Sequence, residues 1–295
     1  MTGVEVAPIR SFHRAVTARI GALEGEYLGR GRSLGECRLL WEVGPGGIEI
    51  RALRRRLGLD SGYTSRLLRS LESQGLVEVA ATGTDGRVRT ARLTAAGELE
   101  RKELDRLSDE LAWSILEPLD ESERRDLAEA ARTVERLLLA SQLTIAVEDP
   151  RAPDARHCLG RYFAELGARF DTGFDPARSI SAGDDEISPP LGLFLVARLR
   201  GEPVGCGALK FRPSSPTEVK RMWVDASVRG LGLGRRLLGE LERRARDAGA
   251  SALRLETNGT LAEAIGLYRS SGYVEVPAFN DEPYAHHWFE KRLTD

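Results

Sequence analysis

A glycine-rich segment stands where a predicted strand passes into a predicted helix. It reads Arg229-Gly230-Leu231-Gly232-Leu233-Gly234-Arg235-Arg236. Glycines at such a turn let backbone N–H groups close on a phosphate, and the helix N-terminus adds the positive end of its dipole. The segment has neither the Gly-Lys-Ser/Thr end of a Walker loop nor the Gly-x-Gly-x-x-Gly order of a dinucleotide fingerprint. Taken alone, it indicates a phosphate site or a plain tight turn about equally.

The residues around this segment narrow its interpretation. The predicted strand Glu218-Val219-Lys220-Arg221-Met222-Trp223-Val224 precedes it, and Asn258 and Glu263-Ala264-Ile265-Gly266-Leu267-Tyr268-Arg269-Ser270-Ser271-Gly272-Tyr273 follow it. Over about residues 143–295, these motifs resemble the GNAT family of N-acetyltransferases. The resemblance implies an α/β mixed-sheet acyltransferase fold that holds acetyl-CoA in a V-shaped opening between the strand ending at Val224 and a strand at residues 253–257. The cofactor-binding residues that it implies are Met222, Trp223, Val224, Arg229, Gly230, Leu231, Gly232, Leu233, Gly234, Arg235, Asn258 and Tyr268.

Acetyl transfer by direct attack of an amine needs an acid for the thiolate and a base for the ammonium. Tyr268 matches the family's general-acid position, although Leu261, Ile265 and Tyr268 also share one helical face, as core residues would. Glu218 and Glu256 are both candidates for the base, acting through a water, and each could instead be a solvated surface carboxylate. Asn258 is expected to hydrogen-bond pantetheine or an ordered water.

Further side chains are expected near the acceptor amine. They are Trp223, Tyr284, His286, His287 and Trp288. The adjacent histidines do not predict a metal, because neighbouring residues on a strand point to opposite faces.

The predicted elements of the second half position these residues. Strands are expected at residues 143–147, 193–199, 203–211, 217–224, 253–257 and near 287–291, with helices at 154–170 and 234–248. Residues 171–192 form a long loop rich in Gly, Asp, Ser and Pro, with room for one short helix. Long loops in compact domains are often functional.

The first half has a different pattern. Helices are predicted at residues 9–28, 34–43, 50–57 and 61–74, the last with Asp60 as its N-cap. A strand follows at 76–79, then an Asp85-Gly86 hairpin turn and a returning strand at 87–93. A helix with an exposed polar first turn fits the major groove of DNA, and an Arg-tipped ribbon can reach phosphates or the minor groove.

This order resembles the MarR family of winged-helix regulators. The carrying residues are Asp60-Ser61-Gly62-Tyr63-Thr64-Ser65-Arg66-Leu67-Leu68, Leu76-Val77, and the stretch from Asp85-Gly86-Arg87 through Leu93-Thr94-Ala95-Ala96-Gly97. The resemblance implies a recognition helix at residues 61–69 and a wing at 85–89, whose Gly86 replaces one basic residue of the usual tip. The DNA-binding residues are then Ser61, Tyr63, Thr64, Ser65, Arg66, Arg69, Arg87 and Arg89. The alternative is a helical dimerisation module with an incidental hairpin.

Two long helices with narrow apolar stripes are predicted at residues 98–116 and 121–140. With no partner between them, such stripes indicate an interface. The family resemblance implies a homodimer built from these helices and residues 9–28. A two-fold dimer would bind a roughly palindromic site.

Composition sets the outer limits. The 295 residues suffice for two domains, and 41% hydrophobic with 30% charged residues is typical of soluble globular proteins. The net charge of −2 excludes nothing, but residues 51–92 hold nine basic and four acidic residues, whereas residues 93–142 hold seven basic and thirteen acidic. No apolar run predicts a membrane span or signal peptide, and three scattered cysteines show no metal or disulfide spacing, so a cytoplasmic protein is expected.

The sequence therefore predicts two domains, at residues 1–142 and 143–295. The first is a mainly α winged helix that binds double-stranded DNA as a homodimer. The second is an acetyl-CoA-dependent N-acetyltransferase acting on a small or protein amine, with no metal and no membrane partner. One alternative is a non-catalytic sensor of acetyl-CoA or a small ligand that controls a MarR-type regulator. Another is an enzyme whose first domain is only a dimer platform.

Overall fold

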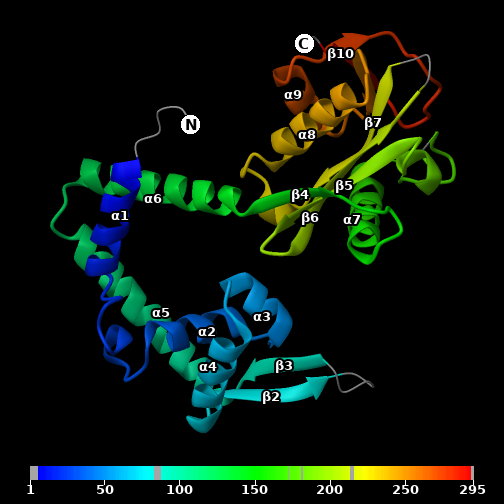
Figure 1. Ribbon diagram of the computed structural model, residues 1–295. Helices are drawn as coiled ribbons and strands as arrows, with labels where there is room; N and C mark the ends of the chain where they lie inside the picture. Colours follow the sequence, from blue (N-terminus) through cyan, green and yellow to red (C-terminus); the bar gives the residue numbers. More distant parts are fainter. Residues whose placement is uncertain (1–5, 83–87, 172, 181, 213–215, 294–295) are drawn as a thin grey trace. The chain divides into compact units, whose positions relative to one another are not determined.

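The computed structural model describes residues 6–82, 88–171, 173–180, 182–212 and 216–293 (Figure 1). The chain forms two compact units, Met1–Ala130 and Ala131–Asp295. The boundary between them falls inside helix α6 (Glu121–Ser141), before the boundary after residue 142 that the sequence predicts. Among the described residues, no helix is long and apolar enough to cross a membrane.

The first unit is mainly helical. Its elements are α1 (Val6–Arg19), the 3-10 helix η1 (Tyr27–Gly29), α2 (Leu34–Val43), β1 (Ile48–Glu49), α3 (Ile50–Leu57), α4 (Ser61–Ser73), β2 (Val77–Thr82), β3 (Val88–Leu93), α5 (Ala95–Leu116) and the first part of α6, up to Ala130. Asp60 caps α4 as predicted, since its side chain accepts a hydrogen bond from the Tyr63 backbone N–H at 2.9 Å. The sheet has the order β1-β3-β2, and the two-residue strand β1 was not predicted.

The predicted helix at residues 9–28 is too long. Helix α1 ends at Arg19, and Gly21 follows with a φ of +69°, a conformation that side chains disfavour. The chain leaves the helical path there, so the apolar stripe does not continue. Leu23 is 81% exposed, whereas Tyr27 is buried and packs edge-on against Trp41 with ring centroids 6.2 Å apart.

The second unit is a mixed sheet covered on both faces. Its elements are β4 (Leu143–Val147), α7 (Pro153–Arg169), η2 (Asp184–Ile187), β5 (Gly192–Leu199), β6 (Glu202–Lys210), β7 (Thr217–Val224), η3 (Ala226–Val228), α8 (Leu233–Asp247), β8 (Ala252–Thr257), α9 (Ala262–Ser270), β9 (Val274–Val276) and β10 (His287–Arg292). The strand order is β4-β5-β6-β7-β8-β10-β9. The predicted mixed-sheet α/β fold is confirmed.

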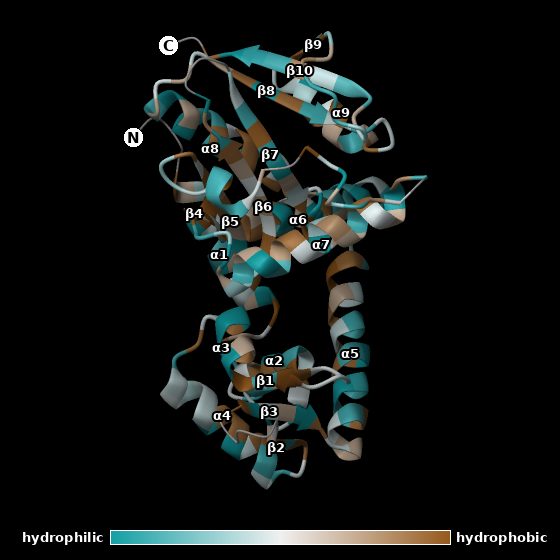
Figure 2. Ribbon diagram, turned by 90° about the vertical axis from the view of Figure 1, so that its right-hand side faces the viewer, coloured by the Kyte–Doolittle hydropathy of each residue, from teal (hydrophilic) through white to brown (hydrophobic). Residues whose placement is uncertain are grey.

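An apolar core lies on each face of this sheet. Leucines of α8 pack with Tyr268 of α9 and with Leu253 and Leu255 of β8 on one face. Ala155, Cys158 and Leu159 of α7 pack on Phe194 and other residues of the opposite face. Figure 1 shows α7 on one side of the strands and α8 and α9 on the other, and Figure 2 shows hydrophobic residues along β7 and β8.

The sheet opens where β7 and β8 pair in parallel. These strands pair at Thr217 with Leu253 and at Glu218 with Arg254, and the pairing goes no further. Beyond Glu218, the edge of β7 that faces β8 has no strand partner among the described residues. On its other edge, β7 carries a bulge, because Arg221 and Met222 together face Gly207 of β6. Arg221 has a φ of +57° there.

Candidate functional site

The opening between β7 and β8 holds two adjoining hollows. The first, here the glycine-loop cleft, has a volume of about 480 Å³ and lies between α7, the end of β7, the segment 228–235 and α9. The second, here the aromatic pocket, has about 100 Å³ and includes Phe170, Phe174 and Tyr284 in its wall. Both are lined by Tyr162, Leu166, Met222, Leu261, Ala264 and Tyr268, so they meet there.

Most of the predicted cofactor residues line the glycine-loop cleft. They are Met222, Trp223, Val224, Arg229, Gly230, Gly232, Leu233, Gly234, Arg235 and Tyr268. Leu231 lies in the same turn but does not line the cleft, and Asn258 lines the aromatic pocket instead.

The backbone of the glycine loop explains its sequence. Gly230 and Gly232 have φ values of +84° and +76°, and Gly232 is the N-cap of α8 without a side chain to cap it. The first N–H groups of α8 therefore lack partners within the helix. Two N–H groups of this loop are already used within the protein: those of Arg229 and Leu231 donate to the Ala226 and Val228 carbonyls at 3.4 and 3.3 Å.

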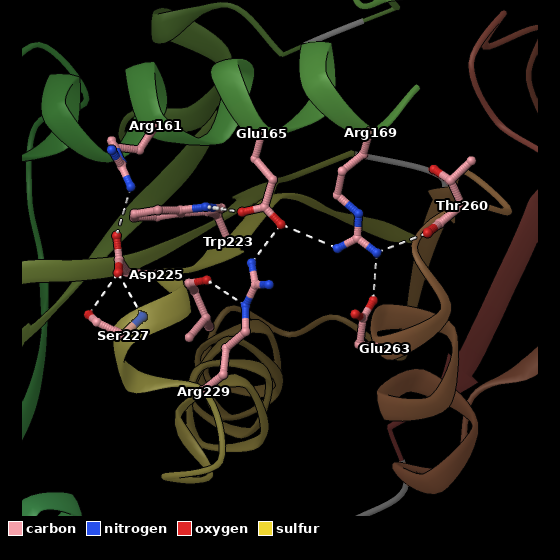
Figure 3. A network of polar contacts seen from close by, with 10 residues as sticks. Arg161, Glu165, Arg169, Trp223, Asp225, Ser227, Arg229, Thr260 and Glu263 are labelled. Atoms are coloured by element: carbon pink, nitrogen blue, oxygen red, sulfur yellow. Dashed lines mark hydrogen bonds and ion pairs between the residues drawn. The ribbon is translucent and has the colours of Figure 1, made fainter. Parts of the chain in front are cut away.

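A polar network that the sequence did not predict crosses the cleft (Figure 3). At its centre is Glu165 of α7, which accepts hydrogen bonds from Arg229 Nη2 at 2.6 Å and from Trp223 Nε1 at 2.9 Å. Burial alone would raise the pKa of Glu165, but its bonds to Arg229 and Trp223 keep that pKa below the usual value. The carboxylate thus stays charged and fixes the predicted cofactor residue Arg229.

Arg169 extends this network from α7 to α9. Its Nη1 lies 3.3 Å from Glu165 Oε1, and its Nη2 donates to the Thr260 carbonyl at 2.9 Å and to Glu263 at 2.8 Å. The only sign of this network in the sequence was the i,i+4 spacing of Glu165 and Arg169, which is typical of an ion pair on a helix. Their partners lie more than 50 positions away, so spacing could not reveal them.

Tyr268 lies where the two hollows meet. The residue is 5% exposed, and no described residue hydrogen-bonds its hydroxyl. Its ring packs near Tyr273 and Phe289, with centroids 5.9 and 6.0 Å away. Burial raises the pKa of Tyr268, so the phenol keeps its proton at and above neutral pH. A proton is therefore present at this position. The two interpretations from the sequence, core residue and acid, are compatible at this position.

The two candidate bases differ in their surroundings. Glu218 bonds Arg212 Nε at 2.9 Å and Lys220 Nζ at 3.1 Å, and it lines neither hollow. Burial alone would raise the pKa of Glu218, but Lys220 and Arg212 keep it below the usual value. Glu256 pairs with Lys220 through Oε1, while its Oε2 is buried, has no hydrogen-bond partner among the described residues, and belongs to a side chain that lines the aromatic pocket.

The amide of Asn258 is already engaged. Its Nδ2 donates to the Tyr284 carbonyl at 2.7 Å, and its Oδ1 accepts from the Thr260 N–H and hydroxyl, each at 2.9 Å. These bonds hold the turn after β8 against the loop before β10. They leave one N–H for the predicted contact to pantetheine or water.

The residues predicted near the acceptor amine do not lie in one place. Tyr284 lines the aromatic pocket, and Trp223 lines the glycine-loop cleft. His286, His287 and Trp288 line neither hollow. His286 Nδ1 accepts from the Gly259 N–H at 3.1 Å, His287 Nδ1 lies 2.6 Å from Glu275, and Trp288 Nε1 donates to Asn280 at 2.8 Å.

Two distant loops close the aromatic pocket. Phe170 and Phe174 lie at the end of α7 and beyond, and their ring centroids are 5.8 and 4.9 Å from that of Tyr284. Glu282, which is 8% exposed, accepts from Ser179 Oγ at 2.8 Å, from the Ile180 N–H at 2.7 Å and from the Tyr284 N–H at 3.3 Å. The carboxylate of Glu282 is thereby used to tie the two loops together.

In the first unit, α4 presents most of the predicted DNA-binding side chains. Ser61, Ser65, Arg66 and Arg69 are exposed, and so is Arg89 on β3. Tyr63 is half-buried, with Arg66 Cζ 5.7 Å from its ring centroid. Thr64 is a wrong prediction, because it is 1% exposed and its hydroxyl donates to the Asp60 carbonyl at 2.8 Å. Arg87, Asp85 and Gly86 lie outside the described residues.

Apolar side chains remain exposed on the helices predicted to form a dimer. Ile9, Phe12 and Val16 of α1 are exposed, as are Trp113 of α5 and Leu127 of α6. Arg19 of α1 donates to the Ser114 carbonyl of α5 at 2.8 Å. The first unit thus carries an apolar surface that its own described residues leave uncovered.

Two protein-family models match the chain, one in each half. The model described as "Acetyltransferase (GNAT) family" matches residues 161–273, and that described as "MarR family" matches residues 30–88. The chain is similar to IAA acetyltransferase of Azospirillum brasilense, with 48% identity over 92 residues, 31% of this chain and 59% of that protein. It is similar to N-alpha-acetyltransferase RimI of Mycobacterium tuberculosis, with 35% identity over 126 residues, 42% of this chain and 74% of that protein.

A solved structure is similar to part of the chain. It is the PcaV transcriptional regulator from Streptomyces coelicolor, with 22% identity, coverage of 46% of this chain and 97% of that one, and a TM-score of 0.37. The chain spans 59% of the length of the IAA acetyltransferase, which is less than two thirds.

Proposed function

Because the chain belongs to the GNAT acetyltransferase family and carries a MarR-family region before that half, we propose that its second unit transfers the acetyl group of acetyl-CoA to a primary amine and that its first unit binds double-stranded DNA. The observation that carries the enzymatic part is the Tyr268 hydroxyl, which lies between two adjoining hollows and is hydrogen-bonded by no described residue. The alternative of a sensor without catalysis leaves such a placement of a proton donor unexplained.

The residues present fit acetyl-CoA. The N-terminus of α8 offers backbone N–H groups and a positive dipole end to a pyrophosphate. Beyond Glu218, the edge of β7 that faces β8 has no strand partner among the described residues, so it offers N–H groups to an extended pantetheine and to negative charge on an acetyl oxygen. Donors of the latter kind typically contribute a factor of ~10²–10³ in rate. The co-substrate supplies the activated acetyl thioester.

Two side chains move the protons. Glu256, through the unpartnered Oε2, takes a proton from the acceptor ammonium, directly or through a water. The N–C bond then forms while the C–S bond breaks. Tyr268 gives its proton to the leaving sulfur and regains one from the attacking nitrogen, so one proton in all leaves to solvent. Each transfer is worth ~10²–10⁴ in rate.

Thiol release from acetyl-CoA over a broad amine panel tests the enzymatic part. Tyr268→Phe is expected to lower kcat by ~10²–10⁴. Tyr273→Phe is a matched control, because that tyrosine is also buried but lines neither hollow. Tight binding of the cofactor without turnover of any amine would favour the sensor. Equal effects of both variants would contradict the assignment of Tyr268.

Salt dependence of binding to duplex DNA tests the first unit. Binding to phosphates releases counterions, so affinity should fall steeply with salt. Replacing exposed Arg66 and Arg69 of α4 by alanine should lower the salt slope by about one for each phosphate that the variant no longer binds. Arg106→Ala on α5 is the control. An unchanged slope in the double variant would exclude α4 as the DNA-contacting helix.

A further inference from the structure

The aromatic pocket contains four charged side chains. Lys220, Arg221, Glu256 and Glu282 line it, so its cations and anions balance. Lys220 has the carboxylates of Glu218 and Glu256 as partners, and Glu282 accepts the hydrogen bonds that tie two loops. Lys220 is therefore neutralised within the protein, and both oxygens of Glu282 already accept hydrogen bonds.

The guanidinium of Arg221 has no such partner among the described residues. Its Cζ lies 4.8 Å from the ring centroid of Phe163 and 6.0 Å from that of Tyr162, both on α7. Nη2 donates to the Ala182 carbonyl at 3.3 Å, and no carboxylate of the described residues forms an ion pair with it. A guanidinium carries five N–H donors in a planar fork that matches a carboxylate, so donors remain for a ligand.

The conformation of Arg221 favours a ligand-binding role. The residue stands in the bulge of β7 with a φ of +57°, which is strained for a residue with a side chain. Bulges beside active sites redirect a side chain, and here the redirected side chain lies at the pocket. Strain of this kind persists where the surrounding fold imposes it.

Glu256 supplies the opposite charge. Its side chain is 9% exposed, Oε1 pairs with Lys220, and Oε2 is buried without a described partner. A buried carboxylate oxygen without a donor is costly, so a donor from a ligand or from water would stabilise it. An ammonium group supplies such a donor and carries the charge opposite to that of the carboxylate.

From these observations we propose that the acceptor amine belongs to a free amino acid with an apolar or aromatic side chain. This inference rests on the proposed acetyl transfer. The ammonium of the amino acid faces Glu256, its carboxylate binds Arg221, and its side chain packs on Phe170, Phe174 and Tyr284. A polyamine would leave the Arg221 guanidinium without an anion, and a dicarboxylate would offer no donor to Glu256 Oε2, whereas a zwitterion supplies both groups.

Paired acceptors test the proposal. L-phenylalanine and L-leucine are compared with L-phenylalaninamide and L-leucinamide, which keep the amine and side chain but lack the carboxylate. The free acids should be favoured in kcat/KM by at least about tenfold, the effect of removing one charge-assisted hydrogen bond. In Arg221→Met, the KM of the acids should rise by that factor, while the KM of the amides stays unchanged. Arg243→Met on the exposed face of α8 should keep the preference.

The outcomes separate this inference from the proposed function. Turnover of the amides equal to that of the acids, in the wild-type protein, would overturn the inference and leave acetyl transfer standing. The same holds if Arg221→Met folds and keeps the preference. If the variant does not fold, the wild-type ratio alone decides. Absence of turnover with every amine would overturn the proposed function and this inference with it.

Discussion

Glu218 and Glu256 form a matched pair for testing the proton acceptor. Both carboxylates bond Lys220 Nζ, and both side chains are largely buried, 14% and 9% exposed. Only Glu256 lines the aromatic pocket, through a carboxylate whose second oxygen has no described partner. Glu256→Gln and Glu218→Gln therefore remove the same kind of ion pair, but only the first removes the proposed base.

The two substitutions should cost similar stability. Each takes one carboxylate from Lys220 and leaves the other in place, so this loss should be that of one hydrogen bond to a charged group, about 1.5–3 kcal/mol. Glu218→Gln also removes the ion pair with Arg212, whose side chain is 40% exposed, which should add no more than about 1 kcal/mol. The rate should separate them. Glu256→Gln should lower kcat/KM by ~10²–10⁴ near neutral pH, whereas Glu218→Gln should have an effect of no more than a few fold.

The pH dependence provides a second readout. As pH rises through the pKa of the acceptor ammonium, more of the amine is already deprotonated and the base is needed less. The gap between Glu256→Gln and the wild-type protein should therefore narrow at high pH. Thiol release from pH 6 to 10, with thermal unfolding of each variant, measures both effects. Equal rate losses in the two variants, or a constant gap across pH, would refute the reasoning.

Three further predictions concern other parts of the chain. Gly232→Ala forces a side chain into a φ of +76°, which costs ~1–2 kcal/mol, and should weaken coenzyme A binding in calorimetry, whereas Gly239→Ala inside α8 should not. Arg30 holds the pKa of Glu100 below its usual value, so their ion pair stabilises the first unit at pH values above the pKa of Glu100 in the unfolded chain. This stabilisation is lost as pH falls through the pKa of Glu100 in the folded protein, so Glu100→Gln should make the free energy of unfolding less dependent on acid pH. Trp113→Ser should shift a homodimer toward monomer in sedimentation, because this exposed indole is expected at the interface.

Local patterns made much of the second unit predictable. The start of α8 follows from glycines before an apolar helical stripe, and the structure places it at Leu233, one residue from the prediction. Strand β9 and strand β1 were missed, because two or three residues carry no detectable period. Helix α1 was extended too far, because the apolar spacing continued beyond Gly21 although the backbone did not.

Long-range polar contacts were beyond the reach of spacing. Glu165 and Arg229 are 64 residues apart, and Arg169 and Glu263 are 94 apart. In the sequence, each is one charged residue among many, with no periodicity that distinguishes it. Only the packing of α7 against the end of β7 and the start of α9 brings them together.

The bulge in β7 shows how one residue decides the chemistry of both hollows. Val219 packs in the core beneath α8, so strict alternation would turn Arg221 and Trp223 to that face as well. The extra residue reverses the alternation. Trp223 instead packs in the core beneath α7, where its indole reaches Glu165, and Arg221 lies over the rings of α7. Met222 turns toward the α8 core. A strand without the bulge would bury the Arg221 guanidinium among leucines. The bulge avoids that cost and places the guanidinium in the aromatic pocket, where we propose that it binds the carboxylate of the acceptor.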